Sequence, residues 1–208
     1  MSTARHITIL TVDDHPIVRE GIASIIQGEE DMVIVGEASN GREAVEVFRQ
    51  KRPDVTLMDL QMPNVNGIDT IAAIRSGHPE ARIVVLTTYE GDALARRALK
   101  AGVAGYLLKD MIRTELLQAI RAVDSGRRYI PHRIAADLAE HYAEDDLSDR
   151  EVQVLRAVAR GMSNKIIASH LSISEATVKA HIKNVMLKLG ASDRTHAVNI
   201  AMTRGFMM

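Results

Sequence analysis

Short apolar runs alternate with amphipathic segments over the first 124 residues. The apolar runs are rich in β-branched residues, which is typical of strands buried on both faces of a parallel sheet. The segments between them are long enough for helices, and 113–124 carries an apolar stripe that includes Leu116 and Ile120. The pattern predicts strands at 7–12, 32–35, 55–58, 83–86 and 105–108, and helices at 16–27, 41–51, 67–76, 91–101 and 113–124.

The alternation ends at residue 124, which sets the predicted domain boundaries. Residues 1–124 hold five strand–helix repeats and therefore predict an α/β domain with a five-stranded, parallel, doubly wound sheet. Residues 125–146 contain Gly126, Pro131 and a closing acidic run, and we interpret them as a linker that carries some helix. Residues 147–208 have a helical period throughout and predict an all-α domain of four helices.

Helix-start signals subdivide the last domain. Ser148 and Glu151 have the spacing of a capping box, Ser163 and Ser174 precede the next two helices, and a fourth helix is expected at about 192–204. Helices of this size separated by short turns are typical of a helix-turn-helix unit.

Charge and composition narrow the classes of function. The net charge of −1 divides into −4 for 1–124, −2 for 125–146 and +5 for 147–208, so the last domain suits a polyanionic partner. The chain has no cysteine, which excludes disulfides, thiolate catalysis and most structural zinc sites. It has no long apolar run and no signal-peptide pattern, so we expect no membrane partner and a cytoplasmic location.

Polar residues stand where the predicted strands end. In a parallel sheet these ends share one edge, where ligands bind. Three carboxylates held close together repel one another unless they share a cation, and hard oxygen ligands favour Mg²⁺. A carboxylate beside a metal, a lysine and a hydroxyl is suited to act as a nucleophile toward phosphorus. Acidic residues also cap turns after strands, but five polar residues at one edge favour a site: Asp13, Asp14, Asp59, Thr87 and Lys109.

Several short motifs resemble a known family. Four motifs resemble the receiver domain of two-component response regulators, which has a flavodoxin-like fold. They are V-D-D-H-P at 12–16, L-M-D-L-Q-M-P at 57–63, L-T-T at 86–88 and G-Y-L-L-K at 105–109. Two further motifs resemble the LuxR-type helix-turn-helix: L-S-D-R-E-V-Q-V-L at 147–155 and A-T-V-K-A-H-I-K-N-V-M-L-K-L at 176–189. In this order the two resemble the NarL/FixJ class, over nearly the whole chain.

The resemblance implies a role for each matching residue. Asp59 matches the phospho-acceptor, which takes a phosphoryl group from a sensor histidine kinase. Asp13 and Asp14 match the acidic pair that holds Mg²⁺ together with Asp59 and the backbone carbonyl of Gln61. The resemblance further implies a phosphoryl-binding lysine, a switch hydroxyl and a switch aromatic, at Lys109, Thr87 and Tyr106. Many receivers have proline after this lysine, whereas this chain has Asp110, as is frequent in the NarL/FixJ class.

Some of these assignments have plainer alternatives on residue type alone. Tyr106 could equally be a core aromatic residue at the start of a strand. Thr88 is an alternative to Thr87 for the switch hydroxyl until the strand register is known. His15 precedes Pro16 in a turn, which favours a turn residue over a metal ligand.

The predicted helix 174–189 has two faces. Val178, Ile182, Val185, Met186 and Leu189 form its inward stripe. The outer face, with its two lysines one turn apart, suits the major groove of double-stranded DNA, and the lysines would contact either phosphates or guanine. The alternative is that this outer face is simply a basic surface exposed to solvent. The candidate DNA contacts, including Lys165 from the preceding helix, are Lys165, Thr177, Lys179, Ala180, Lys183, Asn184 and Lys188.

A helix-turn-helix domain of this size makes few DNA contacts and so has limited specificity, which favours two copies on a two-fold DNA site. We therefore expect a homodimer, formed when the receiver is phosphorylated. Ala197, Val198 and Ala201 form a stripe on the last helix that covers the core and in part offers a dimer face. Phe206 to Met208 either fray or join that patch.

The sequence thus predicts a phosphorylation-switched transcription factor with Mg²⁺ as cofactor and, as an enzyme, at most slow autodephosphorylation. Two other classes stay open. An aspartyl phosphohydrolase would normally carry a second acid at the position of Gln61. A DNA-binding protein that needs no phosphate would have no use for the complete set of strand-end residues.

Overall fold

The computed structural model describes residues 5–62, 67–88, 91–141 and 146–207. Contacts within the chain divide it into two compact units, one formed by residues up to 89 with 95–135 and the other by 90–94 with 136–208. The division at 135/136 falls inside the segment 125–146 that the sequence predicts to be a linker. No helix in the described ranges is both long and apolar enough to cross a membrane.

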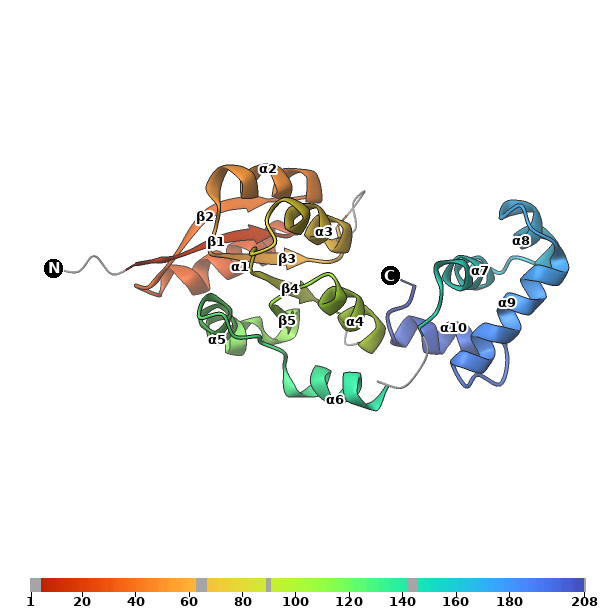
Figure 1. Ribbon diagram of the computed structural model, residues 1–208. Coiled ribbons are helices and arrows are strands. Elements are labelled where there is room, and N and C mark those ends of the chain that lie inside the picture. The colour runs from red at the N-terminus through yellow and green to blue at the C-terminus, as the bar shows by residue number, and fades with distance from the viewer. Residues whose placement is uncertain (1–4, 63–66, 89–90, 142–145, 208) are drawn as a thin grey trace. The chain divides into compact units, whose positions relative to one another are not determined.

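The first unit is built on a five-stranded sheet in which every neighbouring pair is parallel (Figure 1). The strand order is β2-β1-β3-β4-β5, the doubly wound order of flavodoxin-like folds. The predicted fold is therefore confirmed. The strands are β1 (Ile7–Val12), β2 (Met32–Ala38), β3 (Val55–Asp59), β4 (Ile83–Thr87) and β5 (Gly105–Leu108).

Helices cover both faces of this sheet, with α1 and α5 on one side and α2 and α3 on the other (Figure 1). Pro16 opens α1 at a position where its missing N–H costs no hydrogen bond. The side chain of Asn40 caps α2 by accepting from the amide of Glu43. The helices are α1 (Pro16–Gln27), α2 (Gly41–Lys51), α3 (Gly67–Gly77), α4 (Asp92–Lys100) and α5 (Ile112–Asp124).

The chain turns sharply after β5. A short 3₁₀ helix, Lys109–Met111, follows the strand at once and leads directly into α5. Asp110, where many receivers have proline, occupies the middle of this turn and is exposed. Lys109 is thereby held at the end of its strand, at the carboxyl edge of the sheet.

The segment after α5 begins as an extension of the sheet rather than as a free linker. Tyr129 pairs with Gly105 in a parallel bridge: its amide donates to Ala104 O at 3.0 Å, and its carbonyl accepts from the Tyr106 amide at 2.8 Å. The Tyr129 hydroxyl donates to Glu115 Oε2 at 2.6 Å. The expected helix of this segment is present as α6 (His132–Glu140).

The second unit contains α7 (Asp149–Ala159), α8 (Asn164–His170), α9 (Glu175–Lys188) and α10 (Arg194–Thr203). Ser148 and Glu151 form the predicted capping box, and Ser163 and Ser174 cap α8 and α9 as expected. Asp193, rather than a serine, caps the last helix. The apolar core of this unit includes Val178, Val185, Ala197, Ala201 and Phe206, while Met208 lies outside the described residues.

The second unit also takes in the start of α4 at residues 91–94. Arg204, at the end of α10, donates to both carboxylate oxygens of Asp92 at 2.9 and 2.8 Å, and both residues are buried. The Arg204 guanidinium also lies 5.1 Å from the centre of the Phe206 ring. A buried charge is tolerated when it is paired in this way.

Candidate functional site

The predicted strand-end residues meet at one edge of the sheet. Asp59 and Thr87 are the last residues of β3 and β4, and Asp13 and Lys109 directly follow β1 and β5. The register pairs Val12 with Met58, Asp59 with Leu86, and Thr87 with Leu108, so the strands end at nearly the same level.

One ammonium group joins two buried carboxylates there. Lys109 Nζ lies 2.7 Å from Asp13 Oδ2 and 2.9 Å from Asp59 Oδ2. The side chains of Asp13 and Asp59 are only 1% exposed, whereas that of Lys109 is 14% exposed. The lysine thus ties the ends of β1, β3 and β5 together and supplies a fixed positive charge for an anion.

Burial and charge act against each other on these groups. Burial raises the pKa of the Asp59 carboxyl and the charge of Asp13 adds to the rise, while the Gln61 amide and the Lys109 ammonium oppose it without cancelling it. Burial works to lower the pKa of Lys109, but the hydrogen bonds and charges of Asp13 and Asp59 outweigh it, so that this pKa is raised. The site is short of positive charge for its carboxylates, which favours a bound cation.

The donor atoms fit a divalent metal ion. One ligand atom from each of Asp13, Asp14, His15 and Asp59 lies within 4.8 Å of the others. Asp14 Oδ1 is buried and accepts no hydrogen bond within the described part of the chain, although His15 Nδ1 is 2.8 Å away. Carboxylate oxygens left without donors are the hard ligands that Mg²⁺ prefers. The imidazole of His15 is the one part of this cluster that the sequence does not predict.

The remaining predicted receiver residues lie around this cluster. The Gln61 amide donates to Asp59 Oδ1 at 3.0 Å, and the Gln61 side chain accepts from the Thr88 hydroxyl at 3.2 Å. Thr87 and Tyr106 are fully buried and joined by a side-chain hydrogen bond, and burial raises the pKa of the Tyr106 hydroxyl. Of the two threonines, Thr87 is therefore the one in contact with the aromatic, whereas Thr88 is exposed.

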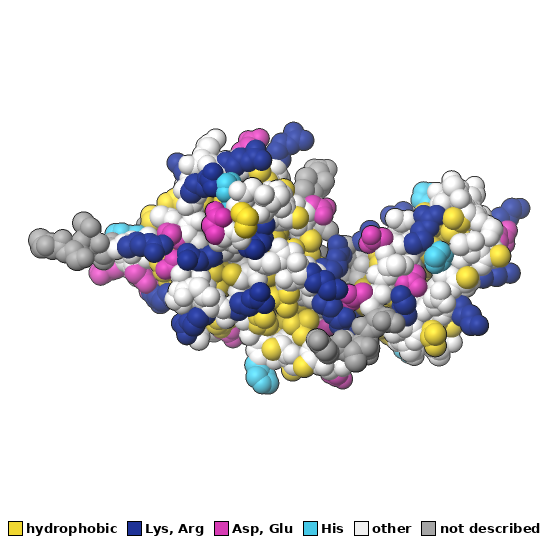
Figure 2. All heavy atoms as spheres, viewed as in Figure 1, with side chains coloured by type: hydrophobic (Ala, Val, Ile, Leu, Met, Phe, Trp, Pro, Cys, Tyr) yellow, Lys and Arg dark blue, Asp and Glu magenta, His cyan; other side chains and the backbone are white. Residues whose placement is uncertain are grey.

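The second unit presents a basic helix face. Val178, Val185 and Leu189 of the predicted inward stripe are buried, and the outer face of α9 is exposed. Figure 2 shows Lys and Arg side chains projecting on the side formed by α8 and α9. The exposed candidates are Lys165, Thr177, Lys179, Ala180, Lys183 and Asn184.

Lys188 differs from these candidates. Its ammonium lies 2.9 Å from Glu151 Oε2 and donates to Asp146 O at 3.1 Å. Glu151 is 4% exposed and is also the acid of the capping box with Ser148. The Lys188 charge is therefore engaged within the unit, a contact between α7 and α9 that the spacing of residues on one helix does not reveal.

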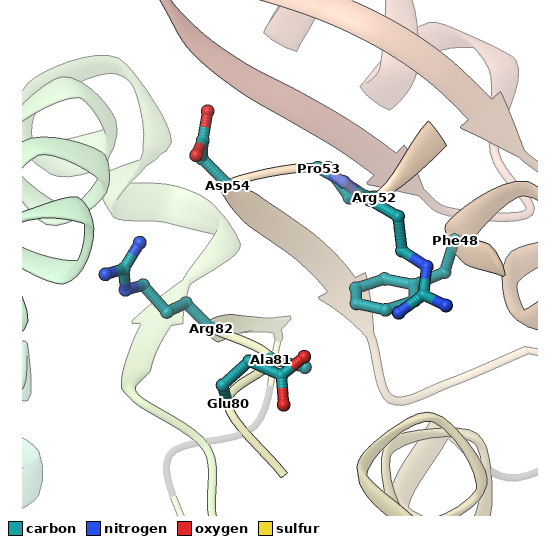
Figure 3. Close-up of a pocket in the computed structure, with 7 residues that line it drawn as sticks. All are labelled: Phe48, Arg52, Pro53, Asp54, Glu80, Ala81 and Arg82. Atoms are coloured by element: carbon teal, nitrogen blue, oxygen red, sulfur yellow. The ribbon is translucent and has the colours of Figure 1, made fainter. Parts of the chain in front are cut away.

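A separate pocket lies at the opposite end of the strands (Figure 3). Its volume is about 300 Å³, and it is set at the start of β3 and β4, away from the carboxyl edge that holds the acidic cluster. Figure 3 shows the Phe48 ring beside the Arg52 side chain, with Asp54 and Arg82 further along the lining. None of the predicted site residues lines this pocket. The lining residues are Phe48, Arg52, Pro53, Asp54, Glu80, Ala81 and Arg82.

Both units match known protein families. Residues 9–121 match the response regulator receiver domain, and residues 145–201 match the bacterial regulatory proteins of the luxR family. The nitrate/nitrite response regulator protein NarL of Escherichia coli is 37% identical over 206 residues, covering 95% of each chain. The transcriptional regulatory protein YdfI of Bacillus subtilis is 39% identical over 207 residues, covering 96% of this chain and 97% of the relative.

Solved structures agree with this assignment. The response regulator ChrA of a heme-sensing two-component system aligns with a TM-score of 0.57 at 36% identity, covering 98% and 99% of the two chains. RcsB of Salmonella enterica serovar Typhimurium, bound to promoter DNA in the presence of the phosphomimetic BeF3⁻, aligns with a TM-score of 0.73 at 28% identity, covering 96% and 99%. This chain therefore belongs to the transcriptional response regulators that join a receiver domain to a LuxR-family DNA-binding domain.

Proposed function

We propose that Asp59 is the phospho-acceptor of this response regulator and that a sensor histidine kinase supplies its phosphoryl group. The observation that carries this assignment is the pair of ion contacts from Lys109 Nζ to Asp13 and Asp59, at 2.7 and 2.9 Å. They lie beside an oxygen of Asp14 that accepts no hydrogen bond from the residues that the structure describes. An anion arriving at Asp59 meets the ammonium at once, and the three carboxylates are left to hold a cation.

In the proposed transfer, a carboxylate oxygen of Asp59 attacks phosphorus. The new O–P bond forms as the N–P bond of the kinase phosphohistidine breaks, and the electron pair of that bond returns to the imidazole nitrogen. Asp13, Asp14, Asp59 and the Gln61 carbonyl would hold Mg²⁺. When bound, this ion neutralises charge on the phosphoryl oxygens. Lys109 neutralises the same oxygens from the protein side, and slow hydrolysis of the acyl phosphate would be the only enzymatic step.

The output we propose is tighter binding of double-stranded DNA by a homodimer. Phosphorylation favours the receiver state in which Thr87 and Lys109 contact the phosphoryl group, and the shift is limited by what these contacts contribute. The buried hydrogen bond between Thr87 and Tyr106 links this change to the interior of the domain. The exposed face of α9 enters the major groove. Since both the kinase phosphoryl donor and the DNA are cytoplasmic, we propose that the protein works in the cytoplasm.

Labelling with acetyl phosphate in the presence of Mg²⁺ tests the acceptor. We expect the wild type to gain one phosphoryl group by intact mass, and the Asp59→Asn variant to gain none because an amide oxygen is a poor nucleophile. Asp69→Asn is the matched control, since Asp69 is an exposed carboxylate on α3, and it should be labelled like the wild type. Full labelling of Asp59→Asn would contradict the assignment.

The same preparation separates the two rival functions. An aspartyl phosphohydrolase would turn over a phosphoester many times, whereas the proposed acceptor gives at most one phosphoryl group per chain. A DNA-binding protein that needs no phosphate would bind DNA equally well before and after labelling.

A further inference from the structure

Tyr129 fastens the segment after α5 to the edge of the receiver sheet. We propose that Tyr129 is the positioning residue through which the phosphorylation state of the receiver reaches α6 and, beyond it, the second unit. This inference rests on the proposed function, from which it takes the phosphoryl group at Asp59. It gives a regulatory role to a segment that the sequence predicts only as a linker.

The chain reverses direction between α5 and Tyr129. Gly126, with φ 81°, lies in the left-handed region that glycine adopts without strain. The amides of Gly126 and Arg127 donate to Val123 O and Ala122 O, which satisfies carbonyls at the end of α5. The chain therefore returns to the sheet and runs beside β5 in the same direction.

Three hydrogen bonds fix Tyr129 between β5 and α5. Its amide donates to Ala104 O at 3.0 Å, and its carbonyl accepts from the Tyr106 amide at 2.8 Å. Its hydroxyl donates to Glu115 Oε2 at 2.6 Å, and the side chain packs against the apolar core of the domain. Burial and the Glu115 carboxylate raise the pKa of this hydroxyl to about 12, so that it stays protonated and able to donate.

Tyr106 joins Tyr129 to the phosphorylation site. The Tyr106 side chain is fully buried and bonded to Thr87, which we propose contacts the phosphoryl group. A turn of Thr87 toward that group would break its bond to Tyr106, and the Tyr106 side chain would shift. Because a close-packed interior transmits such shifts, the Tyr106 backbone moves with its side chain. The hydrogen bond from the Tyr106 amide then carries this movement to the Tyr129 carbonyl.

Tyr129 also determines where α6 begins. Pro131 and Ile134, which flank the first residues of α6, are buried, and the amide of Ala135 donates to Pro131 O at 3.0 Å. Residues 95–135 all belong to the first unit, so the start of α6 is packed on the receiver together with Tyr129. A displacement of Tyr129 therefore changes the direction in which α6 leaves the receiver.

Hydrogen exchange of the full-length protein, with and without beryllofluoride as a mimic of the phosphoryl group, tests the first step. We expect beryllofluoride and Mg²⁺ to change the exchange of peptides that cover 127–135 in the wild type. The same addition should have no effect on these peptides in Asp59→Asn. Unchanged exchange over 127–135 in the wild type, although the adduct forms at Asp59, overturns the inference.

The affinity for a DNA fragment selected by the protein, with and without beryllofluoride, tests the transmission. Tyr129→Phe, which removes only the hydroxyl, should lower the ratio of the two affinities about twofold or more, as residues in a coupling network do. Glu115→Ala should lower this ratio similarly, and the double variant should lower it no further, because both changes remove the same hydrogen bond. Glu115→Gln keeps an acceptor oxygen and should give the wild-type ratio. Gln118→Ala, at an exposed position of α5, is the matched control and should also give the wild-type ratio.

Two results of the DNA measurement overturn the inference. One is a wild-type ratio in Tyr129→Phe, and the other is a ratio in Glu115→Gln as low as that in Glu115→Ala. In both cases the proposed function stands as long as beryllofluoride binds at Asp59 and raises the DNA affinity of the wild type. If beryllofluoride does neither in the wild type, the proposed function fails and the inference fails with it.

Discussion

At the scale of single residues, two positions at the ends of elements shape the two units. Lys109 follows β5 at the point where a 3₁₀ turn begins, and its ammonium therefore lies within 3 Å of two buried carboxylates. Ser172 has a comparable role in the second unit. It lies between α8 and α9 with φ 54°, in the left-handed region that side chains rarely adopt. The turn that orients α9 therefore depends on a residue without a branched side chain.

We predict that Ser172→Val destabilises this turn by about 1–2 kcal/mol, because a β-branched side chain is strained at positive φ. Ser172→Gly should be tolerated, since glycine has no Cβ to clash. Hydrogen exchange measured by mass spectrometry on peptides from α8 and α9 reports the local opening free energy. Equal protection in the two variants would show that the turn carries no such constraint.

At the scale of elements, the hydrophobic pattern predicts nearly all strands and helices. Their bounds follow from local signals such as Pro16, Ser148 and Ser174. The edge pairing of Tyr129 with Gly105 and the contact of Lys188 with Glu151 are not predicted, because each joins elements that are distant in sequence. Patterning within one element carries no information about such partners.

We predict that Lys188→Met destabilises the second unit by about 1–3 kcal/mol, since the nearly buried Glu151 carboxylate loses its positively charged partner and keeps only its hydrogen bonds from Ser148. Lys183→Met is the matched control on the exposed face of α9 and should change stability by less than about 0.5 kcal/mol. Hydrogen exchange in α7 and α9 is the measurement, because residues 147–208 contain neither tryptophan nor tyrosine.

The destabilisation caused by Lys188→Met should depend on pH. Burial tends to raise the pKa of Glu151, but Lys188 and Ser148 together lower it below its ordinary value of 4.5. A carboxyl with a depressed folded-state pKa stabilises the fold above its unfolded pKa, and this contribution is lost as the pH falls through the folded value. The difference between wild type and Lys188→Met should therefore be full at neutral pH and shrink on acidification below about 4.5. A difference that grows on acidification would contradict this role of Glu151.

At the scale of the whole molecule, the charge division of −4 and +5 between the predicted domains fits the two different partners that we propose for them. The acidic cluster, which we propose holds the cation, lies in the first unit, and the exposed lysines lie in the second. The five strand-end residues could be predicted because a parallel sheet brings its carboxyl ends together. The position of the His15 imidazole could not be predicted in this way, because it depends on side-chain geometry in a turn.

We predict that replacing Lys179 and Lys183 together with alanine weakens DNA binding without unfolding the domain. Each lost phosphate contact should lower the slope of log affinity against log salt by about one, and each lost base contact should cost about 1–3 kcal/mol of discrimination. Acetyl phosphate labelling of Asp59 should be unchanged in this variant. Lys51→Ala, at an exposed lysine of the first unit, should bind DNA normally. Wild-type affinity and salt dependence in the double variant would show that this face does not contact DNA.

We propose that a phosphoryl group at Asp59 controls DNA binding. The most direct measurement is the affinity for a DNA fragment selected by this protein, with and without beryllofluoride and Mg²⁺, at fixed salt. We predict that beryllofluoride raises the affinity of the wild type about 5- to 150-fold, the usual range for coupled sites. It should leave the affinity of Asp59→Asn unchanged. An affinity of the wild type that does not respond to beryllofluoride, although the adduct forms at Asp59, would contradict this control of DNA binding by the phosphoryl group.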